Sequence, residues 1–87
     1  MITLRNKYRI YINSKDIKNG KDDGENHPFV LACKRKFKTN KVYMNTYCVV
    51  INGQPYDLWN KTNWDFRHAF TKNKPVKPFH MRIYKYV

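Results

Sequence analysis

Apolar and polar residues alternate near both ends of this chain, which is the pattern of β-strands that bury one face. Between residues 2 and 12 the apolar side chains fall on one side of the expected strand. The other side is mostly basic and comprises Thr3, Arg5, Lys7, Arg9 and Tyr11. Residues 79–87 repeat this division, with an outward face made of His80, Arg82, Tyr84 and Tyr86. Two strands far apart in the sequence are therefore predicted to share one outward chemistry.

The central stretch, residues 29–51, has two apolar and β-branched runs on either side of a polar turn, which predicts a β-hairpin. Its loop is either Thr39-Asn40 or Asn40-Lys41, and both registers give the same faces because strand side chains alternate with period two. The expected outward face comprises Lys34, Lys36, Lys38, Tyr43, Asn45 and Tyr47. The inward face is apolar apart from Arg35, which indicates a register error, a bulge or a dimer contact.

Polar segments separate these strands. Residues 13–27 have no periodicity and hold four of the six acidic residues, so we expect a long, mobile, solvated loop. The Asn52-Gly53 pair predicts a tight turn into a short strand over residues 54–58. Because proline cannot donate to a ladder, Pro55 places that strand at a sheet edge.

A short helix of about ten residues is predicted in the stretch 60–70, with Thr62 or Asn63 as its cap. Phe66, Ala69 and Phe70 would form its apolar stripe. Residues 71–78 contain two prolines and are expected to be an extended basic connector, with Lys72, Lys74 and Lys77.

Together these elements predict a single α+β domain over residues 1–87: about five mostly antiparallel strands, forming a curved sheet or partly closed barrel, with one short helix. The predicted core comprises Leu4, Tyr8, Ile10, Ile12, Phe29, Leu31, Cys33, Val42, Met44, Cys48, Val50, Phe66, Phe70, Met81 and Ile83. We expect both cysteines to be reduced and the protein to be cytoplasmic, because no signal peptide is recognisable. No apolar run is long enough to cross a bilayer, so no membrane association is expected.

The formal net charge is +12, and residues 34–87 hold 12 basic but only 2 acidic residues. Such an excess attracts polyanions, of which nucleic acid is the commonest. Lysines can also protect sheet edges, and tyrosines favour strands, but those explanations fit one strand better than three. Basic residues that bind phosphates and tyrosines that stack on bases favour RNA or another single strand. The predicted nucleic-acid-binding residues are Arg5, Lys7, Arg9, Tyr11, Lys34, Lys36, Lys38, Tyr43, Tyr47, Lys72, Lys74, Lys77 and Arg82.

The sequence also contains residues that would suit a ribonuclease or a protein-binding surface. His68 and His80 could act as base and acid in a small metal-free ribonuclease, but we expect a non-enzymatic protein. Metal-ligand spacing and glycine-rich nucleotide motifs are absent from the sequence, so no cofactor or metal is expected. The aromatic and arginine content also suits a protein partner such as a host enzyme, and a homodimer is a further hypothesis.

The chain is short, rich in Asn, Lys and Tyr, poor in Gly and begins at Met1. In these respects it resembles the small basic early proteins of large lytic bacteriophages. The resemblance implies a host-takeover role in the host cytoplasm, through RNA or a host enzyme. The alternative function is therefore inhibition of a host defence toxin or nuclease by protein contact, with or without RNA.

Overall fold

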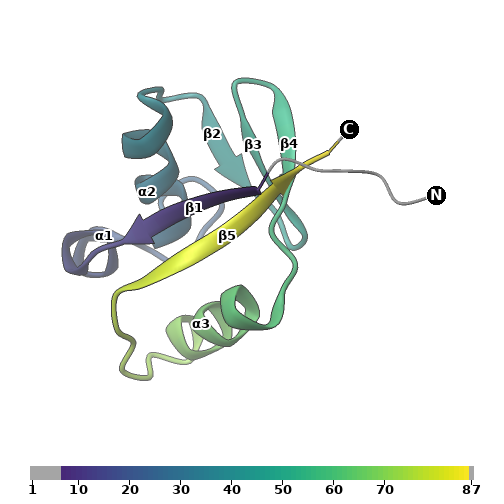
Figure 1. The fold of residues 1–87 in the computed structure, drawn as a ribbon. Coiled ribbons are helices and arrows are strands. Elements are labelled where there is room, and N and C mark those ends of the chain that lie inside the picture. The colour runs from purple at the N-terminus through teal and green to yellow at the C-terminus, as the bar shows by residue number, and fades with distance from the viewer. Residues whose placement is uncertain (1–6, 87) are drawn as a thin grey trace.

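A computed structural model describes residues 7–86 of the 87-residue chain. In chain order its elements are β1 (Lys7–Ile12), α1 (Ser14–Asn19), α2 (Pro28–Phe37), β2 (Val42–Met44), β3 (Cys48–Ile51), β4 (Gln54–Asp57), α3 (Lys61–Thr71) and β5 (Phe79–Lys85). The strands form one antiparallel sheet in the order β1-β5-β4-β3-β2 (Figure 1). The predicted α+β class and curved antiparallel sheet are confirmed, although the described residues form three helices rather than one.

The sheet curls into a half-barrel whose concave side holds the core (Figure 1). Helix α2 contacts both edge strands, β1 and β2, and so covers the opening between them. Helix α3 lies beneath β5, where Phe66 stacks on Phe29 of α2 at a ring distance of 5.4 Å. The fully buried residues include Ile10, Ile12, Phe29, Val30, Ala32, Cys33, Val49, Met81 and Ile83. The helices therefore cover the concave side of the sheet and leave the convex side of β1 and β5 open.

The first strand of the predicted central hairpin is wrong, because residues 28–37 form helix α2. His27 caps this helix by accepting a hydrogen bond from the Phe29 amide, and Pro28 supplies the φ angle that suits a first turn. Phe29, Cys33 and Phe37 recur every four residues, which fits a helix face as well as an alternating strand. Lys34 and Lys36 consequently point to different sides and do not form a lysine row.

Arg35, the exception on the predicted apolar face, forms a specific contact in this helix. Its guanidinium donates to both carboxylate oxygens of Asp16, at 2.7 and 3.0 Å, and to the Tyr11 carbonyl at 2.7 Å. Asp16 lies in α1 within the segment expected to be a loop, and it forms a capping box with Asn13. The prediction missed α1 because six residues are too few to show a helical period.

The real central hairpin is β2–β3, which turns at residues 45–47. This turn shifts the alternation by one residue, so Val49 and Ile51 are buried, whereas the predicted Cys48 and Val50 are only partly covered. Tyr8, Leu31 and Phe70 of the predicted core are also only partly covered. Leu4 lies outside the described residues. Both cysteines are free thiols, and burial raises the pKa of Cys33 to about 12.

The Asn52-Gly53 turn is confirmed, with φ values of 52° and 80° that suit a two-residue hairpin loop. The edge position expected from Pro55 is wrong, because β4 lies between β3 and β5. Pro55 cannot donate a backbone hydrogen bond toward a neighbouring strand. Beside it, the Gln54 side chain donates to the Tyr86 carbonyl at 3.3 Å. The predicted helix is confirmed as α3, but its cap is Asn60.

Candidate nucleic-acid interface

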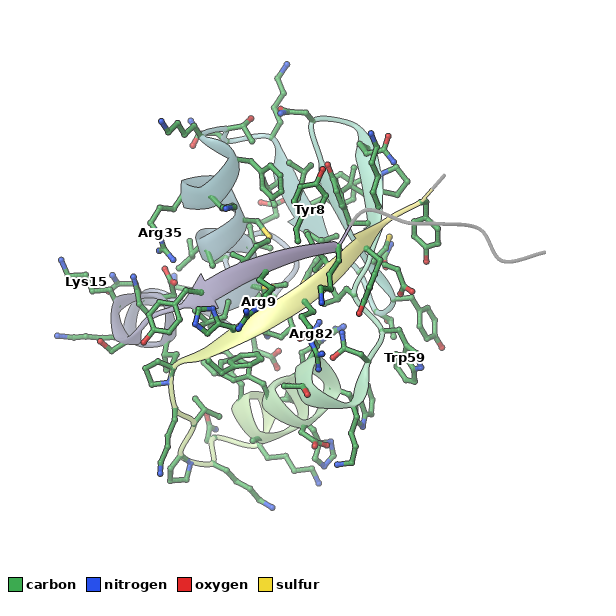
Figure 2. The ribbon with its side chains drawn as sticks, in the orientation of Figure 1. Tyr8, Arg9, Lys15, Arg35, Trp59 and Arg82 are labelled. Carbon is green, nitrogen blue, oxygen red and sulfur yellow. The ribbon has the colours of Figure 1, made fainter. Side chains whose placement is uncertain are left out.

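The convex face of β1 and β5 brings together the basic residues that the two terminal strands were predicted to share. The antiparallel register places Arg9 opposite Arg82, Lys7 opposite Tyr84 and Tyr11 opposite His80. Lys7, Arg9, Tyr11, His80 and Arg82 are all exposed. None of the three helices in residues 7–86 covers this face (Figures 1 and 2). We call these five residues and Tyr84 the basic face.

Four members of the basic face surround an open depression of about 320 Å³, namely Lys7, Arg9, His80 and Arg82. Its lining contains no carboxylate among the described residues. Within residues 7–86, neither arginine forms an ion pair. Like charges directly opposite each other across two strands destabilise a sheet by a few tenths to about 1 kcal/mol. The depression therefore holds uncompensated positive charge that an anion would neutralise.

The basic face continues onto α2 through a second depression of about 290 Å³, where Arg35 and Lys36 join Arg9 and Tyr11. The Asp16 carboxylate already pairs with Arg35 and raises its pKa. Lys36 is exposed and extends the positive surface beyond the sheet. The Tyr11 ring lies 4.9 Å from the His80 ring, which gives this end of the face an aromatic surface.

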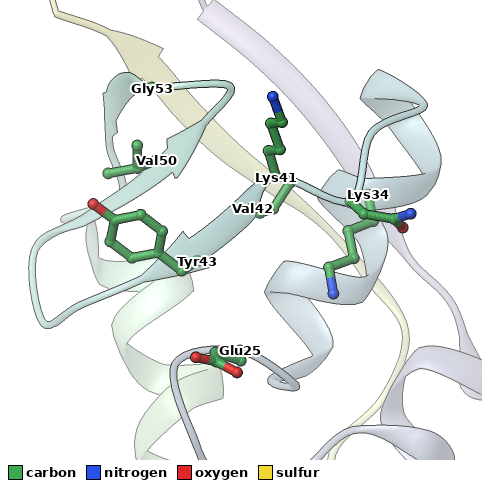
Figure 3. A pocket seen from close by; sticks show the side chains of 8 residues that line it. Glu25, Lys34, Lys41, Val42, Tyr43, Val50 and Gly53 are labelled. Atoms are coloured by element: carbon green, nitrogen blue, oxygen red, sulfur yellow. The ribbon is translucent and has the colours of Figure 1, made fainter.

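The structure separates the remaining predicted binding residues. Lys34 and Tyr43 line a groove of about 440 Å³ beside the β2 edge, together with Lys41 and the acidic Glu25 (Figure 3). Helix α2 lies between this groove and the basic face. Because the groove contains a carboxylate as well as lysines, it is less suited to a polyanion than the basic face.

The other predicted residues lie on several segments. Lys38 follows the last turn of α2, with a φ of 53°. Lys72, Lys74 and Lys77 are exposed in the connector between α3 and β5, whose residues 72–78 form neither helix nor strand. Arg5 lies outside the described residues. These positions carry charge around the molecule, but their side chains do not belong to the basic face.

A row of aromatic side chains, which we call the aromatic ridge, runs from the β2–β3 turn onto α3. Its members are Tyr47, Trp59, Trp64 and His68, with successive ring distances of 5.2, 5.0 and 6.1 Å. The two tryptophans and Tyr47 are among the most exposed large apolar residues of the described chain. Of these four residues, only Tyr47 was predicted to bind nucleic acid, since nothing in the sequence places residues 47, 59 and 64 together.

The start of α3 connects the aromatic ridge to the basic face. Asn60 and Asn63 donate side-chain hydrogen bonds to the Arg82 carbonyl, at 3.0 and 2.8 Å. Trp59 immediately precedes Asn60, so the ridge begins beside the strand that carries Arg82. Figure 2 shows Arg9, Arg82 and Trp59 in succession from the middle of the sheet toward the lower right.

The two histidines of the ribonuclease hypothesis contact different aromatic neighbours: His80 lies against Tyr11, and His68 lies against Trp64. No cluster of metal-ligating side chains occurs in residues 7–86. In the same part of the chain, no helix has the length and apolar character needed to cross a membrane. Searches with the whole chain found no matching family model, curated protein or solved structure.

Proposed function

We propose that this protein binds nucleic acid without catalysis, and that the basic face contacts the phosphate backbone. The observation that carries the proposal is the register of β1 and β5, which sets Arg9 directly opposite Arg82 in a depression without a carboxylate. Fixed strand positions hold both guanidiniums at the same site. Each can donate two parallel hydrogen bonds to one phosphate.

A polyanion fits this surface better than a single small anion. Lys7 and Lys36 extend the positive charge in two directions from the arginine pair. The net charge of +12 adds a long-range attraction for a chain of phosphates. Aromatic side chains beside the charges are the further feature that nucleic acid, with its exposed base faces, can use.

The test is to remove the arginine charges while keeping side-chain length, with the double variant Arg9→Gln/Arg82→Gln. Binding to a labelled oligouridylate is measured by fluorescence anisotropy over a series of salt concentrations. We expect affinity to fall roughly tenfold for each arginine, because each lost contact is a charged hydrogen bond. The slope of log affinity against log salt should fall by about 0.7 per lost phosphate contact.

The matched control is Lys18→Gln/Lys21→Gln, which removes the same charge from exposed positions at α1 and in the following loop. The affinity of the control variant should fall only slightly, because its net charge is lower but the basic face is intact. Equal losses in the two double variants would contradict a specific role for the basic face. Binding that is indifferent to salt would exclude phosphate contacts altogether.

A further inference from the structure

We infer that the aromatic ridge is a stacking platform for unpaired bases, so that the protein selects single strands over duplexes. This inference rests on the proposed function, because the basic face would hold the backbone whose bases reach the ridge. Trp59 is 53% exposed, Trp64 43% and Tyr47 60%. Exposing three large rings in one row costs hydration free energy, which a stacked base would recover.

Ring orientation favours stacking on separate faces. Tyr47 and Trp59 are inclined by 58°, and Trp59 and Trp64 by 52°. Inclined neighbours do not cover each other's faces as parallel stacked rings do, so ring surface remains available. Bases in a duplex have their faces covered by neighbouring base pairs, whereas a single strand can turn them toward the protein.

The ridge is also held in place before any ligand arrives. Arg67 of α3 donates to the carbonyls of Asn45 and Thr46, at 3.2 and 2.7 Å, and so fixes the turn that carries Tyr47. The Asn45 side chain accepts from the Tyr47 amide at 3.0 Å. A platform that is already ordered loses little conformational entropy on binding, which favours affinity.

The charges around the ridge are compatible with a polyanion. Asp65 pairs with Lys61 at 2.8 Å, and the Asp57 carboxylate accepts the Trp59 amide at 2.9 Å. Both nearby acids are thus engaged by neighbours. Arg82 lies directly beyond the start of α3, since Asn60 and Asn63 bind its carbonyl. Phosphates on Arg82 would therefore bring their own bases toward Trp59.

Both tryptophans of the chain belong to the ridge, so intrinsic tryptophan fluorescence reports on it directly. We expect an oligouridylate to quench the emission of the wild-type protein, and an RNA duplex of equal length to quench it much less. Trp59→Ala and Trp64→Ala should each weaken oligouridylate binding about tenfold, measured by anisotropy, because stacking contributes that much per base. Duplex binding should change little, and Trp59→Phe should restore most of the loss.

Tyr43→Ala is the comparison variant: Tyr43 is also 53% exposed, but it lies in the separate groove beside β2, outside both the ridge and the basic face, so its loss should weaken binding less than the loss of either tryptophan. Tryptophan variants that bind the oligouridylate as wild type does would overturn the stacking inference, while the loss in Arg9→Gln/Arg82→Gln would still support the proposed function. If the arginine variant binds normally, the proposed function fails. Equal quenching by single strand and duplex would also overturn the inference.

Discussion

Two regions of the described chain treat arginine differently: the covered side, where contacts hold the helices to the sheet, and the open side of β1 and β5. Arg35 reaches the border of the open side, but it belongs to the contacts that hold the helices, because both oxygens of Asp16 and a backbone carbonyl hold its guanidinium. On the open side, Arg9 and Arg82 face each other across two strands, and neither forms an ion pair within residues 7–86. A charged side chain that is paired within the protein contributes to stability, whereas one without a counter-charge is available to bind an anion.

Other polar groups follow the same division. Arg67 is partly buried, which lowers its pKa, and it holds the β2–β3 turn against α3. His27 is buried beneath the helices and caps α2. On the open side, Lys7 and His80 reach solvent. Changes at Arg35 and His27 should therefore alter stability and spare binding, and changes at Arg9 and Arg82 should do the reverse. Arg67 is the exception, because it also holds the turn that carries Tyr47.

The largest expected effect is a loss of stability in acid, caused by His27 on the covered side. Burial lowers the pKa of His27 from 6.5 to about 4, because its ring lies against Phe29 and Phe70, at ring distances of 4.8 and 5.1 Å. Between these pH values the unfolded chain binds a proton that the folded chain does not. Stability is thus intact above pH 6.5 and falls as the pH falls, by on the order of 3 kcal/mol at pH 4.

Urea denaturation between pH 7 and pH 4 measures this loss. His27→Asn keeps a capping acceptor at the start of α2 but cannot titrate. The variant will be less stable at neutral pH, since the smaller side chain leaves a gap, but its stability should depend less on pH than that of the wild type. Parallel pH profiles would show that His27 does not titrate as its burial requires.

The second expected effect comes from Arg35→Met, which removes the fork to Asp16 while keeping the aliphatic stem. The buried Asp16 carboxylate would keep its capping bond to the Asn13 amide but lose its only cationic partner among the described residues. The loss is moderate because the Arg35 side chain is about half exposed. We expect a loss of about 1–2 kcal/mol, seen as a fall in melting temperature of several degrees. Lys36→Met, at the next residue, is the control and should change the melting temperature little. A stable Arg35→Met protein with impaired RNA binding would reverse the contrast between the two sides.

The same contrast explains which parts of the molecule could be predicted from the sequence. The terminal strands alternate with period two and have one exposed face, so the outward positions of Lys7, Arg9 and Arg82 were correctly predicted, although the pairing of β1 with β5 was not. Helix α2 was not predicted, because Phe29, Cys33 and Phe37 fit both a strand and a helix, and because histidine is not one of the residues preferred as an N-cap. Assigning this segment to a strand also placed Lys34 and Lys36 in one row, whereas in a helix they lie on different sides.

The aromatic ridge could not be predicted for a different reason. Its rings come from a turn, the segment between β4 and α3, and a helix, and only the antiparallel register of β3, β4 and β5 brings these segments together. Arg35 was identified as an exception, yet its partner Asp16 lay in a segment assigned to a loop. Local periodicity thus predicted the charged faces of the terminal strands and missed the contacts that depend on tertiary structure.

The smallest effect tests whether Arg9 and Arg82 are uncompensated. If they repel each other, Arg9→Gln should make the protein more stable at low salt, by about 0.5 kcal/mol. Added salt should stabilise the wild type and remove the difference, because screening is nearly complete at high ionic strength. Lys7→Gln is the matched control: it removes a charge from the same strand and face, but Lys7 lies opposite Tyr84 rather than a cation. The comparison therefore isolates the cross-strand pair from net charge. An Arg9→Gln variant that is less stable than wild type at low salt would mean that the fold itself uses this arginine, and the open side would then not differ from the covered one.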